Sequence, residues 1–243
     1  IPPAAADGAS AGGGGAGGPG LGGFNRRCGG DFSAAHALVA GGGIGRPQLL
    51  RSLTRDPGLA NPGGVPPWTI FTQTLIHDFD TLNWFNAGAR AVEVNAMADA
   101  LVAPDFKERG LLDTAVVTIR YDNGAIATAE ASFAAAYGYD VRGEIFGSAG
   151  MVTAGTPAQV TMAHWSKDGV SSPTTRSDTE LFPDAYAAEL ASFCTAVRAG
   201  SAPEVGGTDA RAALAIALAC IESVQAGGTV TVRDADRVFG GVA

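Results

Sequence analysis

The feature that most narrows the fold of this 243-residue chain is a tight-turn signal, Asp122-Asn123-Gly124, between two alternating segments. Asn-Gly readily adopts positive φ, and such a pair between alternating apolar and polar runs predicts a β-hairpin. The two runs are residues 114–121 and 125–133. Further candidate strands alternate in the same way or are short and apolar, and they cover residues 48–53, 91–98, 140–147, 151–154, 159–164 and 229–233.

Apolar residues at helical spacing predict helices over residues 31–40, 72–85, 184–198 and 209–225. Asp31 and Thr208 are placed to cap the first and the last of these helices. The polar residues 166–177 are expected to form a loop. A run of strands followed by two helices predicts an α+β fold, with an open, mostly antiparallel sheet and helices on one face.

Residues 1–22 are almost entirely Gly, Ala and Pro, and such a stretch buries too little apolar area to offset its ordering entropy. We expect a flexible tail there and a short second tail over residues 236–243. The run Gly15-Ala16-Gly17-Gly18-Pro19-Gly20 formally matches GxGxxG. We reject it as a dinucleotide-binding fingerprint, because no strand precedes it and a proline lies inside it.

Composition excludes several classes of function. The net charge of −8 argues against binding to nucleic acid and to anionic membrane surfaces. Cys28, Cys194 and Cys220 are far apart and odd in number, which indicates neither a disulfide framework nor a zinc site and favours a cytoplasmic location. No apolar run approaches the roughly 20 residues that span a membrane, and no signal peptide is evident.

The segment 72–85, TQTLIHDFDTLNWF, separates into two faces when wound as a helix. Its apolar face carries Leu75, Ile76, Phe79 and Leu82. The other face carries Gln73, Thr74, His77, Thr81 and Trp84, where a surface helix would normally carry Lys and Glu. These groups suit a cleft that binds a polar small molecule. A buried helix whose histidine is satisfied by hydrogen bonds is the alternative.

Several segments occur in an order that is specific as a set. They are Gly23-Phe24-Asn25-Arg26-Arg27, Ile44-Gly45-Arg46-Pro47, Arg55-Asp56-Pro57, Ile76-His77-Asp78-Phe79-Asp80, Asp113-Thr114-Ala115, Tyr137-Gly138-Tyr139-Asp140, Phe146-Gly147-Ser148-Ala149-Gly150-Met151-Val152 and Phe182-Pro183-Asp184-Ala185-Tyr186 with Glu189. Over residues 23–235 the chain thus resembles the glucose–fructose oxidoreductase / inositol dehydrogenase (Gfo/Idh/MocA) family, with its closest likeness to the myo-inositol 2-dehydrogenase branch.

The resemblance implies NAD- or NADP-dependent dehydrogenation of a cyclic polyol by a two-domain protein. Residues 23–43 would be the last strand and helix of a Rossmann domain. Residues 44–235 would be the C-terminal substrate domain, which forms a homo-oligomer through its sheet face. The glycine fingerprint, the ribose-binding acid and the catalytic lysine of a Glu-Lys-Pro motif have no counterpart in this sequence. The nucleotide-binding half is therefore expected to be largely missing.

Dehydrogenation of an alcohol needs a base for the hydroxyl proton and an acceptor for the hydride, which is the nicotinamide. By resemblance, His77 takes part in the proton transfer. The family has an aspartate four residues earlier, where this chain has Gln73. An amide can orient the imidazole but cannot offset the charge of an imidazolium. We therefore predict a turnover lower by about 10²–10⁴ than with the carboxylate.

Other site residues follow from the resemblance, and each has a packing or turn role as its alternative. The expected substrate-binding residues are Asn25, Thr74, Tyr137, Arg55 and Asp56. Tyr186 matches a position near the nicotinamide and is the expected cofactor-binding residue. Asp78 and Asp80 are expected to form caps or salt bridges.

Two rival functions remain. His77-Asp78 could be half of a metal-dependent phosphohydrolase site, but such a site needs further His and Asp ligands. The other histidines, His36 and His164, lie in a helix near the tail and in a late strand, so no metal site is predicted. The second rival is a substrate-domain remnant that oligomerises through its sheet and catalyses nothing.

Overall fold

The computed structural model describes residues 20–158 and 160–233. The expected tails at 1–22 and 236–243 and the GxGxxG match lie outside these ranges, except for residues 20–22. The helices are η1 (Asn25–Cys28), α2 (Gly30–Ala40), η2 (Pro62–Gly64), η3 (Ile70–Thr74), α3 (Leu75–Phe85), η4 (Pro104–Arg109), α4 (Asp178–Leu181), α5 (Pro183–Ala199) and α6 (Gly207–Ala226). The strands are β1 (Pro47–Arg55), β2 (Ala91–Asp99), β3 (Thr114–Tyr121), β4 (Ile126–Ser132), β5 (Asp140–Gly147), β6 (Gly150–Ala154), β7 (His164–Ser166), β8 (Gly169–Ser171) and β9 (Val230–Thr231).

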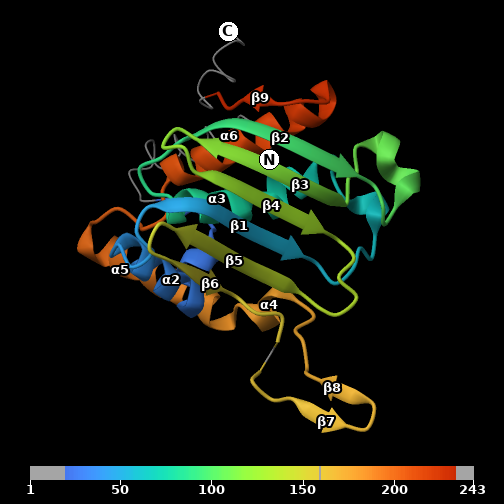
Figure 1. Ribbon diagram of the computed structural model, residues 1–243, viewed down its shortest axis with the longest axis horizontal. Helices are drawn as coiled ribbons and strands as arrows, with labels where there is room; N and C mark the ends of the chain where they lie inside the picture. Colours follow the sequence, from blue (N-terminus) through green and yellow to red (C-terminus); the bar gives the residue numbers. More distant parts are fainter. Residues whose placement is uncertain (1–19, 159, 234–243) are drawn as a thin grey trace.

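A seven-stranded sheet in the order β6-β5-β1-β4-β3-β2-β9 forms the body of the described chain (Figure 1). Every strand pair in it is antiparallel except β1–β4. The predicted hairpin joins β3 to β4, and Gly124 has the positive φ, 88°, that such a turn requires. The prediction of an open, mostly antiparallel sheet is therefore confirmed.

Helices cover one face of this sheet. The helix α3 packs against β1 and β4, α6 packs against β2 and α3, and α2 packs against β6 (Figure 1). Alternate strand residues point toward the helices, so Val117, Ile119 and Tyr121 of β3 are almost completely buried. The other face carries charged side chains and exposed apolar ones, among them Met97, which is 72% exposed.

Two predictions about the chain between β6 and α5 are wrong. Residues 160–163, expected in a strand over 159–164, are not strand, and residue 159 is not described. The expected loop over 166–177 instead begins with the last residue of β7 and contains β8, and the β7–β8 hairpin projects from the sheet in Figure 1. All six residues of the two strands are exposed, so no alternation of apolar residues signals them.

The beginnings of two helices also differ from expectation. The N-cap of α6 is Gly206 rather than Thr208, because the Oδ2 of Asp209 reaches back to accept from the Gly206 N–H at 2.9 Å. Gly29, not Asp31, is the N-cap of α2. Residues 25–28 form a 3₁₀ turn where the resemblance implied a strand, and no strand is assigned within residues 20–43.

Candidate active site

A buried ion pair anchors the floor of the candidate site. Arg26 of η1 donates through Nη1 to the Oδ1 of Asp78 on α3 at 2.8 Å, and both side chains are nearly inaccessible. The hydroxyls of Ser52 and Thr54 on β1 donate to the same carboxylate at 2.5 and 2.7 Å. Four groups from three segments thus satisfy one another, which buried charges require. The predicted salt-bridge role of Asp78 is confirmed.

Asp80, two residues further along α3, also forms a buried ion pair with an arginine of η1. Its Oδ2 accepts from the Nε of Arg27 at 2.8 Å, and the Nη2 of Arg27 also lies 3.1 Å from Asp209 on α6. Burial raises the pKa of Asp80, and the hydrogen bonds from Arg27 oppose that rise. The predicted salt-bridge role of Asp80 is also confirmed. The two ion pairs tie η1 to the helix that carries His77.

His77 comes directly before Asp78 in sequence but has different surroundings. Its ring is perpendicular to the ring of Phe24, with the ring centroids 5.6 Å apart. Burial and the positive charge of Arg26 lower the pKa of His77 to about 4, against a weaker opposing effect of Asp78. Its Nδ1 is buried without a hydrogen-bond partner among the described residues. The imidazole is therefore neutral near pH 7 and has one unused ring nitrogen.

The lowered pKa of His77 predicts how the stability of the folded chain depends on pH. An ordinary histidine in the unfolded chain takes up a proton near pH 6.5, whereas folded His77 does so only near pH 4. Between these values the unfolded state binds more protons, so the free energy of unfolding falls as the pH falls, by about 3 kcal/mol in all. His77→Gln should lack this loss when urea unfolding is compared at pH 7 and pH 4.5. An identical loss in both proteins would contradict the prediction.

A cavity of about 120 Å³ opens beside His77. Six predicted site residues line it, namely Asn25, Asp56, Gln73, Thr74, His77 and Tyr186. Sequence reasoning missed five more, namely Arg26, Thr54, Tyr139, Asp178 and Phe182. Four of these five carry polar groups. The volume of the cavity leaves room for one small ring. Its walls offer that ring hydroxyl, amide, imidazole and carboxylate groups.

A π-helical turn, η3, delivers Gln73 and Thr74 to the cavity. Trp68, just before it, has a φ of 62°, a left-handed conformation that is unusual for an aromatic residue. Its carbonyl accepts hydrogen bonds from the N–H groups of Phe71 and Thr72. No hydrogen bond joins the side chains of Gln73 and His77 in the described structure. The Gln73 amide therefore does not hold the imidazole through a hydrogen bond in this structure.

Arg55 and Tyr137 do not line the cavity, contrary to expectation. Arg55 alternates with Thr54 along β1 and so faces the opposite side of the sheet, where its Nη2 lies 2.9 Å from Glu130. The hydroxyl of Tyr137 donates to Asp140 at 2.6 Å. Two residues later in the same segment, Tyr139 occupies the cavity wall instead.

Two carboxylates line the cavity, and each lies near a tyrosine. The Tyr186 hydroxyl donates to the Oδ2 of Asp178 at 2.7 Å, and the pKa of Tyr186 rises to about 12, through burial first and this carboxylate second. Tyr139 lies beside Asp56 in the cavity wall and lowers the pKa of that carboxyl. Burial raises the pKa of Asp56 to about 6, and Tyr139 and Arg26 only partly offset that rise. Asp56 is thus a second group with an altered pKa beside the substrate space.

The other histidines do not join this site. His36 of α2 stacks on Trp84 with the ring centroids 3.9 Å apart, and His164 is exposed on β7. Among residues 20–158 and 160–233, no three His, Cys, Asp or Glu side chains gather in a way that could hold a metal ion. The described helices include none with the length and apolar composition that a membrane crossing needs.

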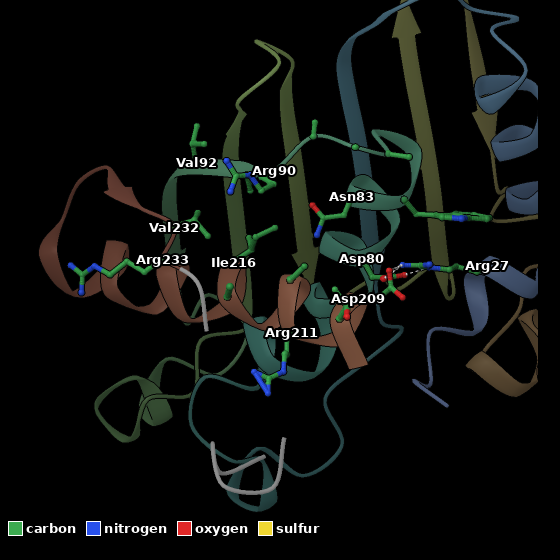
Figure 2. A pocket seen from close by; sticks show the side chains of 18 residues that line it. Arg27, Asp80, Asn83, Arg90, Val92, Asp209, Arg211, Ile216, Val232 and Arg233 are labelled. Atoms are coloured by element: carbon green, nitrogen blue, oxygen red, sulfur yellow. Dashed lines mark hydrogen bonds and ion pairs between the residues drawn. The ribbon is translucent and has the colours of Figure 1, made fainter. Parts of the chain in front are cut away.

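A larger cavity of about 720 Å³ lies away from His77, between α3, β2 and α6 (Figure 2). Arg27 meets Asp80 and Asp209 at one end of it. Figure 2 shows Arg90, Arg211 and Arg233 extending in different directions from its walls. Their guanidinium groups do not converge on one point, so this cavity lacks the geometry of a single anion site.

A glycine-rich dinucleotide turn is not found after any strand in residues 20–158 and 160–233. Phosphates of such cofactors bind at a glycine-rich turn between a strand and a helix. None of the described strands is followed by a GxGxxG turn that opens a helix. Tyr186, the expected cofactor-binding residue, lines the cavity beside His77 with its hydroxyl bound to Asp178.

Comparison with known proteins gives the family. Residues 32–153 match the model of the GFO/IDH/MocA C-terminal domain. The myo-inositol 2-dehydrogenase of Thermotoga maritima is 34% identical over 84% of this chain and 61% of its own length. A probable dehydrogenase from Thermotoga maritima of known structure is 33% identical, with a TM-score of 0.81 over 86% of this chain and 64% of the other. The chain belongs to the Gfo/Idh/MocA family of oxidoreductases.

A further solved structure shows a relative with ligands. It is the scyllo-inositol dehydrogenase of Lactobacillus casei with bound NAD(H) and scyllo-inositol, which is 28% identical and has a TM-score of 0.78. It covers 86% of this chain, and the alignment covers 64% of that protein. The present chain thus spans less than two thirds of the length of these relatives.

Proposed function

We propose that this chain carries the substrate side of an NAD-dependent dehydrogenase that acts on a cyclic polyol, most specifically an inositol. One observation supports this above the others: a neutral imidazole, His77, borders a small cavity whose other walls are polar. A ring with many hydroxyls matches such walls, because each hydroxyl can both donate and accept. Membership of a family with inositol dehydrogenases adds the reaction class.

The residues of the cavity have distinct roles in this proposal. A neutral imidazole can accept the hydroxyl proton of the bound alcohol, which the protonated form cannot. Thr74, Asn25 and Gln73 offer hydroxyl and amide groups that hold the remaining hydroxyls of the ring. Arg26, already fixed by Asp78, keeps a positive charge next to the base. The hydride acceptor is NAD(P), for which the described residues provide no phosphate site.

Gln73 distinguishes this chain from the family pattern. With an amide at this position, the imidazolium that forms during proton transfer lacks a carboxylate one turn before it, and the carboxylate of Asp78, which pairs with Arg26, favours the charged ring only weakly. We propose that turnover is consequently low, by about 10²–10⁴ relative to a chain with aspartate there. The competing function is binding of the polyol without catalysis.

Binding of the polyol is the direct test. Millimolar myo- or scyllo-inositol should raise the melting temperature, because a ligand at 100 times its Kd adds about 2.7 kcal/mol to the stability of the folded state. Thr74→Phe, which fills the cavity, should abolish the rise. Arg90→Ala, on the larger cavity, should keep it. No rise in the unmodified chain, or an equal rise with Thr74→Phe, would refute the proposed site.

We also propose a homo-oligomer that forms through the uncovered face of the sheet. Large apolar side chains are exposed along neighbouring strands there, including Leu49, Phe146 and Met151 on β1, β5 and β6. Exposed apolar residues that gather in this way are typical of protein interfaces. Light scattering should give a mass above that of one chain, and Phe146→Glu should lower it. A monomer for both would contradict the proposal.

A further inference from the structure

A hairpin whose residues are all exposed projects from the sheet. Every residue from 160 to 172 is exposed, and this segment, here called the arm, contains β7 and β8 (Figure 1). Trp165 is 77% exposed and pairs with Val170 across the hairpin. Met162 and Val160 of the same arm are also at least half exposed. Large apolar groups that gather on a surface in this way are typical of a region that another molecule covers.

The base of the arm is fixed to the wall of the smaller cavity. Thr174 forms an antiparallel bridge with Ala158, and its hydroxyl donates to the Tyr137 carbonyl. The N–H of Tyr139, which lines that cavity, donates to the Thr175 carbonyl at 2.8 Å. The body of the protein thus sets the direction of the arm, whereas the tip gains no burial from it. A two-stranded hairpin without further packing is only marginally stable in water, so a partner is needed to stabilise the arm.

The uncovered face of the sheet carries a row of apolar side chains that matches the arm. Leu49 of β1 lies beside Ile126 of β4 and opposite Phe146 of β5, and Phe146 lies opposite Met151 of β6. These four side chains, here called the apolar row, therefore stand at one level across four neighbouring strands. Each of them is between 41% and 55% exposed.

The dimensions of this face fit a second copy of the chain. Strands about 4.8 Å apart, with residues about 3.3 Å apart, give the six longer strands a face of roughly 700 Å². A standard protein interface buries about 800 Å² on each partner. Stacked sheets lie about 10 Å apart, and a strand of three residues is also about 10 Å long. A hairpin of the size of β7–β8 therefore has the length to reach the sheet of a facing copy.

We propose that two copies of this chain associate with the arm of each packed on the apolar row of the other. Trp165 and Val170 of one copy cover the row of the second copy, and two-fold symmetry makes the contact reciprocal. Lys167 and Asp168 at the tip pair with each other at 2.7 Å, so the tip brings no net charge to the contact. This inference rests on the proposed homo-oligomer, since it names the segment that joins the copies.

Analytical ultracentrifugation of the complete 243-residue chain tests the inference. Trp165→Ser should raise the dissociation constant of the dimer at least tenfold, because buried tryptophans are among the residues that contribute most to interfaces. Leu190→Ser is the matched control. It changes a residue of α5 that is 65% exposed on the helical side, and it should leave the dissociation constant unchanged. Circular dichroism checks that both variants are folded.

The fluorescence of Trp165 reports the contact independently of mass. When the protein concentration is raised through the dissociation constant, the emission of the unmodified chain should shift to shorter wavelength as this side chain leaves water. Trp165→Phe keeps an aromatic ring and should still associate, but its emission should not shift. The other tryptophans, Trp68 and Trp84, are already partly buried against the core and remain in all these proteins.

The outcomes separate the inference from the proposed oligomer. If the unmodified chain associates and Trp165→Ser associates equally well, the inference is overturned and association through the sheet face stands. A monomer at every concentration removes both and leaves a different protein as the partner of the arm. A double-mutant cycle tests the position of the contact. Trp165→Ala and Phe146→Ala together should weaken association less than the product of their separate effects. Strictly independent effects would overturn the contact between the arm and the apolar row.

Discussion

Asp78→Ala is expected to lower the free energy of unfolding by about 3–5 kcal/mol. The substitution leaves the Arg26 guanidinium buried without its counter-ion, and it removes the acceptor that the hydroxyls of Ser52 and Thr54 share. Removing one partner of a buried pair is costly because the other charge stays desolvated. Urea unfolding followed by circular dichroism measures the change.

Two further proteins make this prediction specific. Asp168→Ala removes an ion pair with Lys167 in which the two side chains are 76% and 88% exposed, and it should cost less than about 1 kcal/mol. The double change Arg26→Met/Asp78→Leu removes both buried charges and should recover much of the loss. If Asp78→Ala and Asp168→Ala were equally stable, the ion pair would not anchor η1 to α3.

Gln73→Asp is expected to raise the pKa of His77 by about 1–3 units and to increase turnover by about 10²–10⁴. A carboxylate at position 73 would share the cavity with the imidazole and favour its charged form. Titration of the imidazole by NMR reports the pKa without any need for cofactor. The rate of NAD reduction with inositol, measured with a nucleotide-binding half supplied, reports turnover.

Gln73→Asn is the matched control, because it shortens the side chain as aspartate does and keeps the amide. Its His77 should titrate as in the unmodified chain. If the aspartate and asparagine variants titrated alike, position 73 would not act on the imidazole. A raised pKa without a gain in turnover would support the competing function, a protein that binds the polyol and catalyses nothing.

Sequence reasoning predicted much of the site because several of its residues are close in sequence. Gln73, Thr74 and His77 lie within one turn and a half, and helical periodicity alone groups them on one side. Arg26, Thr54 and Asp178 come from distant segments, and only packing brings them to the same cavity. The choice of Tyr139 over Tyr137 follows from the path of the loop before β5, which no periodic pattern reveals.

The sequence by itself determined the elements whose signals are local. The strands 114–121 and 140–147 have the predicted bounds, because alternation and an Asn-Gly turn depend only on neighbouring residues. Tertiary structure alone decided that β1 lies between β4 and β5, parallel to the first, and that Arg26 meets Asp78 across 52 positions. Backbone conformation is governed by near neighbours, whereas pairing of strands and charges depends on which distant surfaces become buried together.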